Sequence, residues 1–352
     1  MLILGIETSC DDTAASLLEV RNNSLKVLSS IISSQIKLHA KYGGVFPSLA
    51  AREHVKNLPG VIKLALTKKH LKDIDVIAVT RGPGLISSLL VGTAFAQTLA
   101  WKYNKPLVGV NHLEGHLASN WLPQASNNQK KAATNNHLPA MCLIVSGGHT
   151  ELVLMTGINK YKLVGHTLDD AAGEAFDKIA RILGLGYPGG PAVAATAAKL
   201  KVGGEKLKIK LPRPMLHSKD LNFSFAGLKT AVLYLTRDLT KNKKRLSPQI
   251  RAAIAAEAQQ AIVDVLVIKT ILAAEKYKVK SVMLSGGVSA NKLLRSELEN
   301  ASTKKGLKFF RPKMDYTTDN ATMIALAGYW RWKLKKQKTD WKSVQVDANL
   351  DL

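Results

Sequence analysis

Two histidines stand four residues apart in the segment His112-Leu-Glu-Gly-His116. On a helix, residues at this spacing share one face about 6 Å apart, which suits two imidazoles that bind one metal ion. Glu114 lies two residues from each histidine and therefore points to the opposite side of such a helix. The zinc-peptidase motif His-Glu-x-x-His places its catalytic carboxylate differently. The segment indicates a metal site without zinc-peptidase chemistry, although a histidine pair at this spacing also arises by chance.

A carboxylate far along the chain is a candidate for a third metal ligand. Asp319 stands in Thr317-Thr-Asp-Asn320, at the start of a stretch predicted to be helical. An aspartate there commonly caps the helix, because its side chain accepts hydrogen bonds from the first backbone N–H groups. The same carboxylate also suits a divalent metal beside two imidazoles. The sequence leaves both roles open.

Two glycine-rich turns that follow apolar strands are candidate phosphate sites. Ser146-Gly-Gly-His-Thr150 follows the apolar run 141–145, and Ser285-Gly-Gly287 follows the run 281–284. Paired glycines let backbone N–H groups approach a phosphate closely, and the neighbouring hydroxyls add donors. Taken alone, the first turn is explained equally well as a plain tight hairpin. The repetition favours binding of a phosphate or a nucleoside.

Acidic residues and a further glycine turn lie between these two segments. Glu174 and Asp177 suit hydrogen bonds to ribose hydroxyls, but the residues alone favour carboxylates that solvate or cap a helix. Gly186-Tyr-Pro-Gly-Gly-Pro191 predicts a rigid turn in which Gly189 and Gly190 would let a ligand lie against the main chain. The turn 80–85, by contrast, is interpreted as a structural turn that leads into a helix.

The elements that must position these residues are short strands joined in hairpins. A strand–turn–strand unit near the N-terminus recurs in the middle of the chain, and helices of three- and four-residue apolar spacing lie between. The predicted strands are 2–6, 14–20, 76–79, 141–145, 152–155 and 281–284, and the predicted helices include 88–102 and 251–276. Two hairpin-led α/β units predict a duplicated fold with two lobes around a nucleotide cleft.

The border between the lobes is expected at a polar segment. Residues 125–138 are rich in Asn, Gln, Lys and Ala and are interpreted as a flexible loop. Residues 1–124 then form an N-terminal lobe and residues 139–352 a C-terminal lobe, whose last segment is free to pack back on the N-terminal one. Residues 203–222 are expected to be an irregular decoration of the second lobe.

Composition and charge narrow the compartment and the partners. A chain of 352 residues buries a large core without disulfides, and its two isolated cysteines, Cys10 and Cys142, indicate a reducing compartment. No secretory leader and no apolar run of about 20 residues is visible, so the cytoplasm is expected. A formal charge of +24 fits a nucleic-acid partner and a merely solvated basic surface equally well.

The set of motifs resembles one family, the bacterial TsaD transferases, formerly described as O-sialoglycoprotein endopeptidases. The resemblance covers nearly the whole chain. The motifs that carry it are Gly5-Ile-Glu-Thr-Ser-Cys-Asp11, Tyr42-Gly-Gly-Val45, Gly82-Pro-Gly-Leu85, His112-x-x-x-His116, Ser146-Gly-Gly-His-Thr150, Leu168-Asp-Asp-Ala-Ala-Gly-Glu-Ala-Phe-Asp-Lys178, Gly186-Tyr-Pro-Gly-Gly190, Phe223-Ser-Phe225 with Gly227-Leu-Lys-Thr230, Ser285-Gly-Gly-Val-Ser-Ala-Asn291 and Thr318-Asp-Asn320. The histidine at position 149 of the glycine turn makes the sequence resemble the bacterial branch of the family.

The resemblance implies a fold and a set of site residues. The fold is that shared by actin, sugar kinases and heat-shock chaperone ATPases (the ASKHA fold). A metal, usually Fe²⁺ and sometimes Zn²⁺, is implied at His112, His116 and Asp319. The implied adenylate-binding residues are Ile144, Val145, Ser146, Gly147, Gly148, Asp177, Gly190 and Asn291.

The resemblance also implies the reaction and its partners. The reaction moves a threonylcarbamoyl group from threonylcarbamoyl-AMP to the N6 amine of the adenosine beside the anticodon of tRNA. The amine must lose a proton, and Asp11 or Asp12, in the first turn, is the hypothesised base. Further implied partners are a TsaB-like paralogous subunit without the metal site and a TsaE-like small P-loop ATPase. Arg331 and Lys333, Lys335 and Lys336, interleaved with Trp330 and Trp332, suit tRNA contact, although a helix whose tryptophans pack on the lobe is favoured.

Some positions depart from the family pattern, and two other functions compete. Ser48, Ser87 and Ala321 replace residues usual in the family, and Asp12 replaces its usual glutamate, but none is a proposed metal ligand. A metallopeptidase would need a carboxylate that activates water near the metal, and Glu114 points the wrong way. An ATP-binding scaffold or sugar kinase of the same fold would leave the histidine pair incidental.

Overall fold

The computed structural model describes residues 1–22, 24–66, 69–123, 129–131, 137–200, 209–241, 245–335 and 340–352. Most of the loop expected at 125–138 lies outside these residues, as does the part of the irregular region before residue 209. Within the described ranges, no helix combines the length and the apolar composition needed to cross a bilayer.

The chain folds into two compact units. The first comprises Met1–Asn136, Gly157–Tyr161 and Arg311–Leu352, and the second comprises His137–Thr156 and Lys162–Phe310. The sequence assigns residues 139–352 to one lobe and leaves its last segment free to pack back on the other; in the structure the last 42 residues, Arg311–Leu352, belong to the first unit. The physical reason is helix α10 (Ala321–Lys335), which packs on the sheet of the first unit.

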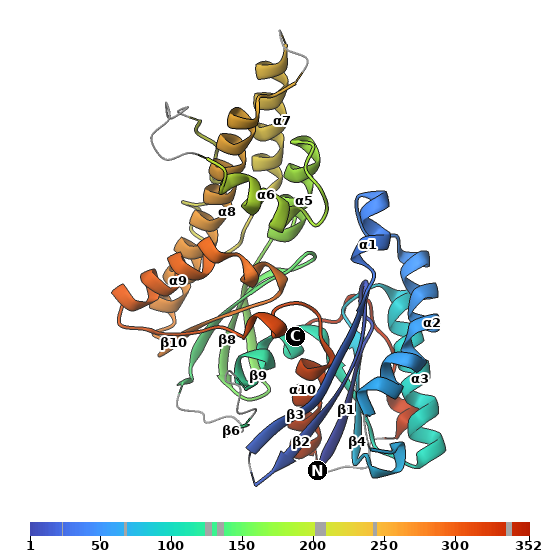
Figure 1. The fold of residues 1–352 in the computed structure, drawn as a ribbon. Helices are drawn as coiled ribbons and strands as arrows, with labels where there is room; N and C mark the ends of the chain where they lie inside the picture. Colours follow the sequence, from blue (N-terminus) through green and yellow to red (C-terminus); the bar gives the residue numbers. More distant parts are fainter. Residues whose placement is uncertain are drawn as a thin grey trace. The chain divides into compact units, whose positions relative to one another are not determined.

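The first unit is built on a six-stranded mixed sheet in the order β5-β4-β1-β2-β3-β6 (Figure 1). Its strands are β1 (Leu2–Glu7), β2 (Asp12–Arg21), β3 (Ser24–Ser34), β4 (Val76–Gly82), β5 (Leu107–Asn111) and β6 (Gln129–Lys131). The hairpin β1–β2 is antiparallel, while β1–β4 and β4–β5 are parallel. The predicted N-terminal strand–turn–strand unit is therefore confirmed.

Helices cover both faces of this sheet. The helical segments of the unit are α1 (Ile36–His39), η1 (Ala40–Tyr42), α2 (Pro47–Leu66), η2 (Leu71–Asp73), α3 (Ile86–Tyr103), α4 (His112–Ala118), η3 (Ser119–Trp121), η6 (Met314–Tyr316), α10 and η7 (Trp341–Ser343). Leu4 and Ile6 of β1 pack in one core with Leu58 of α2 and Ala96 of α3. Gly5 faces the other way, and a Cβ there would lie 2.1 Å from the carbonyl oxygen of Ala321. Helix α10 therefore packs on β1 at backbone contact distance.

The second unit holds a five-stranded sheet in the order β11-β10-β7-β8-β9. Its strands are β7 (Ala140–Val145), β8 (Thr150–Gly157), β9 (Lys160–His166), β10 (Ser281–Ser285) and β11 (Lys308–Phe310). The hairpin β7–β8 is antiparallel, whereas β7–β10 and β10–β11 are parallel. Each unit thus begins with an antiparallel hairpin whose first strand also pairs in parallel with a later strand, which is the predicted duplication.

The helices of the second unit bury one large apolar core. They are α5 (Ala172–Ile182), α6 (Gly189–Ala197), α7 (Ala226–Thr240), α8 (Pro248–Lys276), η5 (Gly287–Ala290) and α9 (Lys292–Lys304). Phe176 of α5, Ile262 of α8 and Leu294 of α9 pack in the same core as Leu143 of β7. This core holds the ends of β7 and β10 side by side, and both predicted glycine turns begin there.

Candidate metal centre and nucleotide site

The two histidines lie on a short helix that starts where β5 ends. Asn111 closes the strand and caps α4, because its side-chain oxygen accepts the backbone N–H of Leu113 at 2.8 Å. The expected helical spacing is confirmed: the rings of His112 and His116 lie with centroids 4.7 Å apart. His112 is 6% exposed and His116 is fully buried. Buried imidazoles require partners, and the candidates lie within the same unit.

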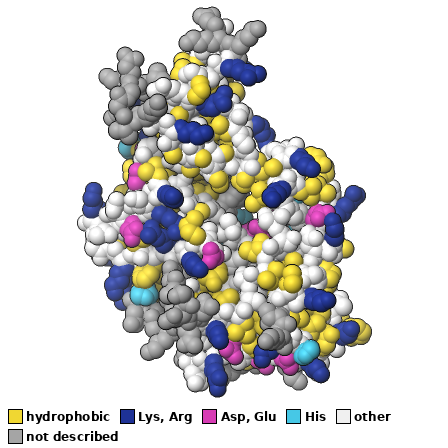
Figure 2. Space-filling model, viewed as in Figure 1, with side chains coloured by type: hydrophobic (Ala, Val, Ile, Leu, Met, Phe, Trp, Pro, Cys, Tyr) yellow, Lys and Arg dark blue, Asp and Glu magenta, His cyan; other side chains and the backbone are white. Residues whose placement is uncertain are grey.

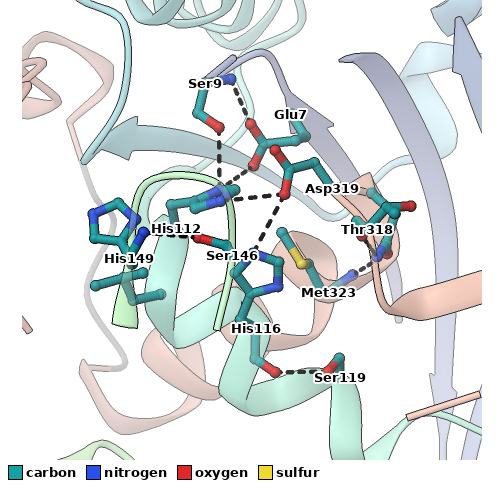
Figure 3. Close-up of polar contacts among 12 residues, drawn as sticks. Glu7, Ser9, His112, His116, Ser119, Ser146, His149, Thr318, Asp319 and Met323 are labelled. Atoms are coloured by element: carbon teal, nitrogen blue, oxygen red, sulfur yellow. Dashed lines mark hydrogen bonds and ion pairs between the residues drawn. The ribbon is translucent and has the colours of Figure 1, made fainter. Parts of the chain in front are cut away.

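Asp319 is the carboxylate that meets both imidazoles (Figure 3). Its Oδ1 atom lies 3.4 Å from Nε2 of His112 and 3.3 Å from Nε2 of His116. The adjacent Asn320 caps α10, because its side-chain oxygen accepts the N–H of Met323 at 3.0 Å. The sequence left open whether Asp319 caps the helix. In the structure Asn320 is the cap, and Asp319 faces the histidines.

The spacing and the unsatisfied nitrogens of this cluster fit a metal ion. One ligand atom from each of the three side chains lies within 4.8 Å of the others. Ligands that bind one ion at about 2.1 Å with tetrahedral angles are about 3.4 Å apart, close to both Nε2···Oδ1 distances. Among the described residues, neither ring nitrogen of buried His116 has a hydrogen-bond partner. Such orphaned buried nitrogens are costly unless a ligand satisfies them.

Glu7 supports the cluster from the other side of His112. This carboxylate is fully buried at the end of β1, and its Oε2 atom lies 3.0 Å from Nδ1 of His112. Thr80 donates its hydroxyl to the same oxygen at 2.6 Å, and the Ser9 backbone N–H donates to Oε1 at 2.5 Å. A carboxylate that holds the far nitrogen of a histidine fixes the ring and its tautomer, as in many metal sites.

The buried charges shift the pKa values of the cluster in opposite directions. Burial lowers the pKa of His112, but the Asp319 and Glu7 carboxylates outweigh it and leave this pKa well above its usual range. Burial likewise raises the pKa of Asp319, but the His112 and His116 imidazoles outweigh it and hold this pKa low. Burial lowers the pKa of His116. The metal-free cluster therefore carries a protonated His112 beside an ionised Asp319 at neutral pH.

The two candidate bases occupy the turn that joins β1 to β2. Burial raises the pKa of Asp12 to about 7, with smaller contributions from the charges of Asp319 and Asp11. Burial and the charge of Asp319 also raise the pKa of Asp11. In the described part of the chain, Oδ1 of Asp12 is buried and has no hydrogen-bond partner. Both carboxyls thus belong to the same unit as the histidine cluster and interact electrostatically with it.

The first glycine turn connects β7 to β8 in the second unit. Ile144 and Val145 are fully buried at the end of β7, whereas Gly147 and Gly148 are exposed. The hydroxyl of Ser146 accepts the backbone N–H of His149 at 3.1 Å, which closes the turn. The backbone oxygen of Ser146 accepts the N–H of Gly173 at 3.2 Å, so the N-terminus of α5 abuts the turn. A helix N-terminus and exposed glycine N–H groups are features of phosphate sites.

The remaining adenylate candidates lie in the same unit and already make structural hydrogen bonds. Asp177 accepts the backbone N–H of Gly189 at 2.6 Å, at the start of α6. Asn291 caps α9 through its side-chain oxygen and donates its amide to Gln259 at 3.0 Å. The prediction of a turn through Gly190 is wrong at its end, since α6 begins at Gly189. The first N–H groups of a helix need no intrahelical partner, so glycines are tolerated there.

The role of Glu7 and the partner of Glu114 were not predicted from the sequence. Glu7 lies in the segment Gly5–Asp11, and its only signal in the sequence is a charged residue at the end of an apolar strand. Glu114 turns away from the cluster, as expected, and forms an ion pair with Arg331.

Trp330 is buried against Trp121 with ring centroids 5.4 Å apart. The interpretation of this helix as a packing element therefore agrees with the structure at Trp330 and Arg331; Lys336 lies outside the described residues.

Solved structures share this fold at low sequence identity. The structure of T. kodakarensis HypF matches 97% of this chain and 48% of that chain, with a TM-score of 0.58 and 16% identity. A second HypF structure, in a phosphate- and nucleotide-bound form, matches with a TM-score of 0.56 and 12% identity. The expected ASKHA-type α/β fold is thereby confirmed.

Curated relatives match the chain over nearly its whole length. A protein of Thermosipho melanesiensis named tRNA N6-adenosine threonylcarbamoyltransferase is 50% identical over 331 residues, which cover 94% of each chain. A protein of the same name from Thermosipho africanus is 46% identical and covers 100% of this chain and 98% of its own. The family model TsaD, described as tRNA N6-adenosine threonylcarbamoyltransferase, matches residues 26–326. The chain belongs to the TsaD family.

Proposed function

We propose that this protein transfers the threonylcarbamoyl group of threonylcarbamoyl-AMP to the N6 amine of the adenosine beside the anticodon, in tRNAs that read codons beginning with adenine. Two observations support the proposal. The chain belongs to a family described by this activity. Its first unit also gathers His112, His116 and Asp319 into one cluster with metal-ligand spacing.

The chemistry asks the protein for positioning and charge stabilisation. The lone pair of N6 attacks the carbamoyl carbon, a C–N bond forms, and the bond from that carbon to the phosphate oxygen breaks. AMP leaves with the bonding electron pair, and N6 loses one proton. Because the leaving group already activates the carbon, orientation of the two substrates and stabilisation of developing charge account for most of the required catalysis.

Asp12 is the better of the two candidates for the proton acceptor. A general base works best when its pKa lies near the working pH, and the pKa of Asp12 is raised to about 7. Its buried Oδ1 atom has no hydrogen-bond partner among the described residues, so no existing hydrogen bond would break when it accepts a proton. Asp11, whose pKa is also raised, is the second candidate.

The metal ligands are proposed to be His112, His116 and Asp319, with Fe²⁺ as the ion and Zn²⁺ as the alternative. When bound, the ion supplies a Lewis acid that grips the threonyl carboxylate or polarises the carbamoyl carbonyl. Glu7 holds Nδ1 of His112 and so leaves Nε2, which lies 3.4 Å from Asp319, as the nitrogen that would bind the ion. Ser9 adds a second contact, since its hydroxyl lies 3.2 Å from the same Nδ1 atom.

The adenylate is proposed to bind in the second unit. The exposed N–H groups of Gly147 and Gly148 and the N-terminus of α5 would hold the phosphate. Asp177 and Gly190 would contact the ribose, and Asn291 the nucleoside. Ile144, Val145 and Ser146 supply the strand end and the closing hydrogen bond that shape the turn.

The charge of the chain supports tRNA as the second substrate. Lysine and arginine exceed aspartate and glutamate by 24, and Figure 2 shows basic side chains spread over the visible surface of the described residues. Such a surface attracts a polyanion and gains from counterion release. We further propose a TsaB-like subunit and a TsaE-like ATPase as partners, and the cytoplasm as the compartment.

The peptidase alternative is not favoured. A metallopeptidase needs a carboxylate beside the metal to activate water. Glu114, the carboxylate nearest in sequence to the histidines, is buried and engaged by Arg331. The kinase-like alternative has no observation in its favour beyond the shared fold.

Reconstitution tests the proposal. The metal-loaded protein, with candidate partners, is incubated with threonylcarbamoyl-AMP and unmodified tRNA, and the digested nucleosides are analysed by mass spectrometry. We expect threonylcarbamoyladenosine to form in proportion to the tRNA supplied. A parallel incubation with a sialylated glycoprotein is expected to leave it intact. Cleavage of the glycoprotein without modification of the tRNA would overturn the assignment.

A further inference from the structure

We propose that the ion pair between Glu114 and Arg331 is a positioning device for the metal centre. The pair sets the rotation of helix α4 about its own axis, so that His112 and His116 both face Asp319. Neither residue touches the cluster itself, so both act through the helix. This inference rests on the proposed metal centre at these three side chains.

The pair has the geometry of a buried fork. Nη2 of Arg331 donates to Oε1 of Glu114 at 2.7 Å, and Nε of the same guanidinium donates to Oε2. Glu114 is only 5% exposed, and the Arg331 side chain is 28% exposed. Two parallel hydrogen bonds between planar groups restrict orientation far more than a single point contact does.

Helix α4 meets α10 at a glycine, between the histidines and the ion pair. A Cβ at Gly115 would lie 2.7 Å from Cδ1 of Ile324 and 3.1 Å from Cγ of Met323, so the two helices touch there. On a helical wheel the histidines lie about 60° and 100° to one side of Gly115, and Glu114 about 100° to the other. The helix is thus held on one side by Asp319 and on the other by Arg331.

The two residues that hold α4, Asp319 before α10 and Arg331 within it, lie far apart along the chain. Asp319 directly precedes the capping residue of that helix, and Arg331 follows it by twelve residues, roughly 18 Å at the rise of an α-helix. A rotation of α4 that brings Glu114 away from Arg331 therefore carries the imidazoles away from Asp319. Because Glu114 and the histidines lie on opposite sides of one helix, the Glu114–Arg331 contact constrains the ligand geometry.

A clamp of this kind adds to the packing of α4, whose seven residues are all buried. A helix of that length is too short for stability without tertiary contacts. At its contact with Ile324 and Met323 of α10, Gly115 contributes no side chain of its own. A Glu114 carboxylate without its partner would be a buried uncompensated charge, which is strongly unfavourable.

Cobalt binding tests the proposal, because Co²⁺ reports both affinity and ligand geometry through its visible absorption. Metal-free full-length protein is titrated with Co²⁺ for the wild type, Glu114→Gln, Arg331→Met and the double variant. The control is Glu257→Gln, which breaks a partly buried pair with Arg213 in the second unit. Thermal unfolding of each metal-free protein is recorded in parallel, and titrations are run well below each midpoint.

We expect each single variant at positions 114 and 331 to bind Co²⁺ about 10- to 100-fold more weakly, with an altered absorption band. The double variant removes both charges, so it should regain thermal stability while its Co²⁺ affinity stays low. Glu257→Gln should lose stability and keep its Co²⁺ affinity. If the double variant instead regained wild-type Co²⁺ affinity, or if the single variants stayed within twofold of Glu257→Gln, the pair would be only a structural contact.

A different result would mark failure of the metal centre itself. If the wild type and His116→Ala bound Co²⁺ equally weakly, the cluster would not be a metal site and there would be nothing for the ion pair to position. That outcome differs from the previous one, in which the wild type binds Co²⁺ tightly and the substitutions at positions 114 and 331 do not lower its Co²⁺ affinity.

Discussion

Nδ1 of His112 lies 3.0 Å from Oε2 of Glu7, a fully buried carboxylate 105 residues earlier in the chain. The contact joins the end of β1 to the start of α4 and leaves Nε2 of the same ring directed at Asp319. A histidine held in this way presents one defined nitrogen to a metal ion. The strongest consequences of the structure follow from this arrangement.

Replacing Glu7 by glutamine should weaken metal binding without removing any ligand. The amide keeps the shape of the carboxylate but loses the charge that favours a proton on Nδ1 of His112. We expect metal affinity to fall about tenfold or more, measured by calorimetric titration of the metal-free protein. Glu53→Gln, which removes a half-buried carboxylate 3.9 Å from Lys56 on α2, is the matched control and should leave affinity unchanged. Equal affinities for the two variants would show that Glu7 does not support the centre.

Metal binding should release a proton and weaken as the pH falls. The Asp319 and Glu7 carboxylates outweigh burial and raise the pKa of His112, so in the metal-free protein Nε2 carries a proton that the ion must displace. Below that pKa, affinity should fall by about a factor of ten per pH unit. Calorimetry in buffers of different ionisation enthalpy measures the number of protons released, which we expect to be about one per ion. Release of no proton between pH 6 and 8 would contradict this assignment of charge.

Asp12→Asn should stabilise the protein in a pH-dependent way. Burial raises the folded-state pKa of Asp12 to about 7, whereas the unfolded chain ionises near 4. Between these values the folded state binds the extra proton, so Asp12 reduces stability progressively as the pH rises from 4 to 7. The variant should match the wild type near pH 4 and gain about 2–4 kcal/mol at pH 8. Urea unfolding of metal-free protein at both pH values measures the difference, and a gain that is equal at both would refute the raised pKa.

The same substitution should reduce turnover if Asp12 is the base. Transfer should slow by about 10²–10⁴-fold, while binding of the adenylate in the second unit stays unchanged. Asp11→Asn provides the comparison, because the pKa of Asp11 is also raised. A slow Asp11→Asn and an active Asp12→Asn would exchange the two roles. Full activity in both variants would remove this turn from the proton transfer.

Two helical glycines should respond in opposite ways to alanine. A Cβ at Gly328 of α10 would lie 2.4 Å from the Cβ of Ala78 on β4, and neither atom can rotate away. At exposed Gly60 of α2 nothing lies within 4 Å. We expect Gly328→Ala to destabilise by about 1–3 kcal/mol and Gly60→Ala to stabilise by up to about 1 kcal/mol, as measured by denaturant unfolding. A stabilising Gly328→Ala would contradict the close packing of α10 on the sheet.

The sequence predicts the elements of this protein better than their assembly. Local patterns were enough to predict several strands and the helical spacing of His112 and His116, because alternation and i, i+4 spacing are local properties. The strands are β1, β2, β7, β8 and β10. The sequence allowed the last segment to pack on the first lobe but did not give its start at Arg311, because that depends on which sheet face α10 covers. The periodicity of α10 does not indicate that Gly5 on β1 and Gly328 on the helix itself allow the helix and the sheet to approach closely.

Residue roles at the site divide in the same way. Asn320 and Asp319 are adjacent polar residues before a helix, and only the packing of α10 decides which one caps it and which one faces the histidines. The Glu114–Arg331 pair joins residues 217 positions apart. Helical geometry predicts that Glu114 points away from the histidines but cannot name its partner. The start of α6 at Gly189 could not be predicted from the sequence, because glycine usually weakens a helix.

Single-turnover transfer by Asp319→Asn tests the central claim most directly. The variant keeps the shape of the side chain and loses the charge that meets both imidazoles, while Asp315→Asn, an exposed carboxylate paired with Lys313, serves as control. With saturating threonylcarbamoyl-AMP and unmodified tRNA, we expect modification by Asp319→Asn to be at least about 100-fold slower, since a metal contributes several kcal/mol to such a reaction. Adenylate binding and the Asp315→Asn rate should match the wild type. An Asp319→Asn rate within about threefold of the wild type would contradict a catalytic metal held by His112, His116 and Asp319.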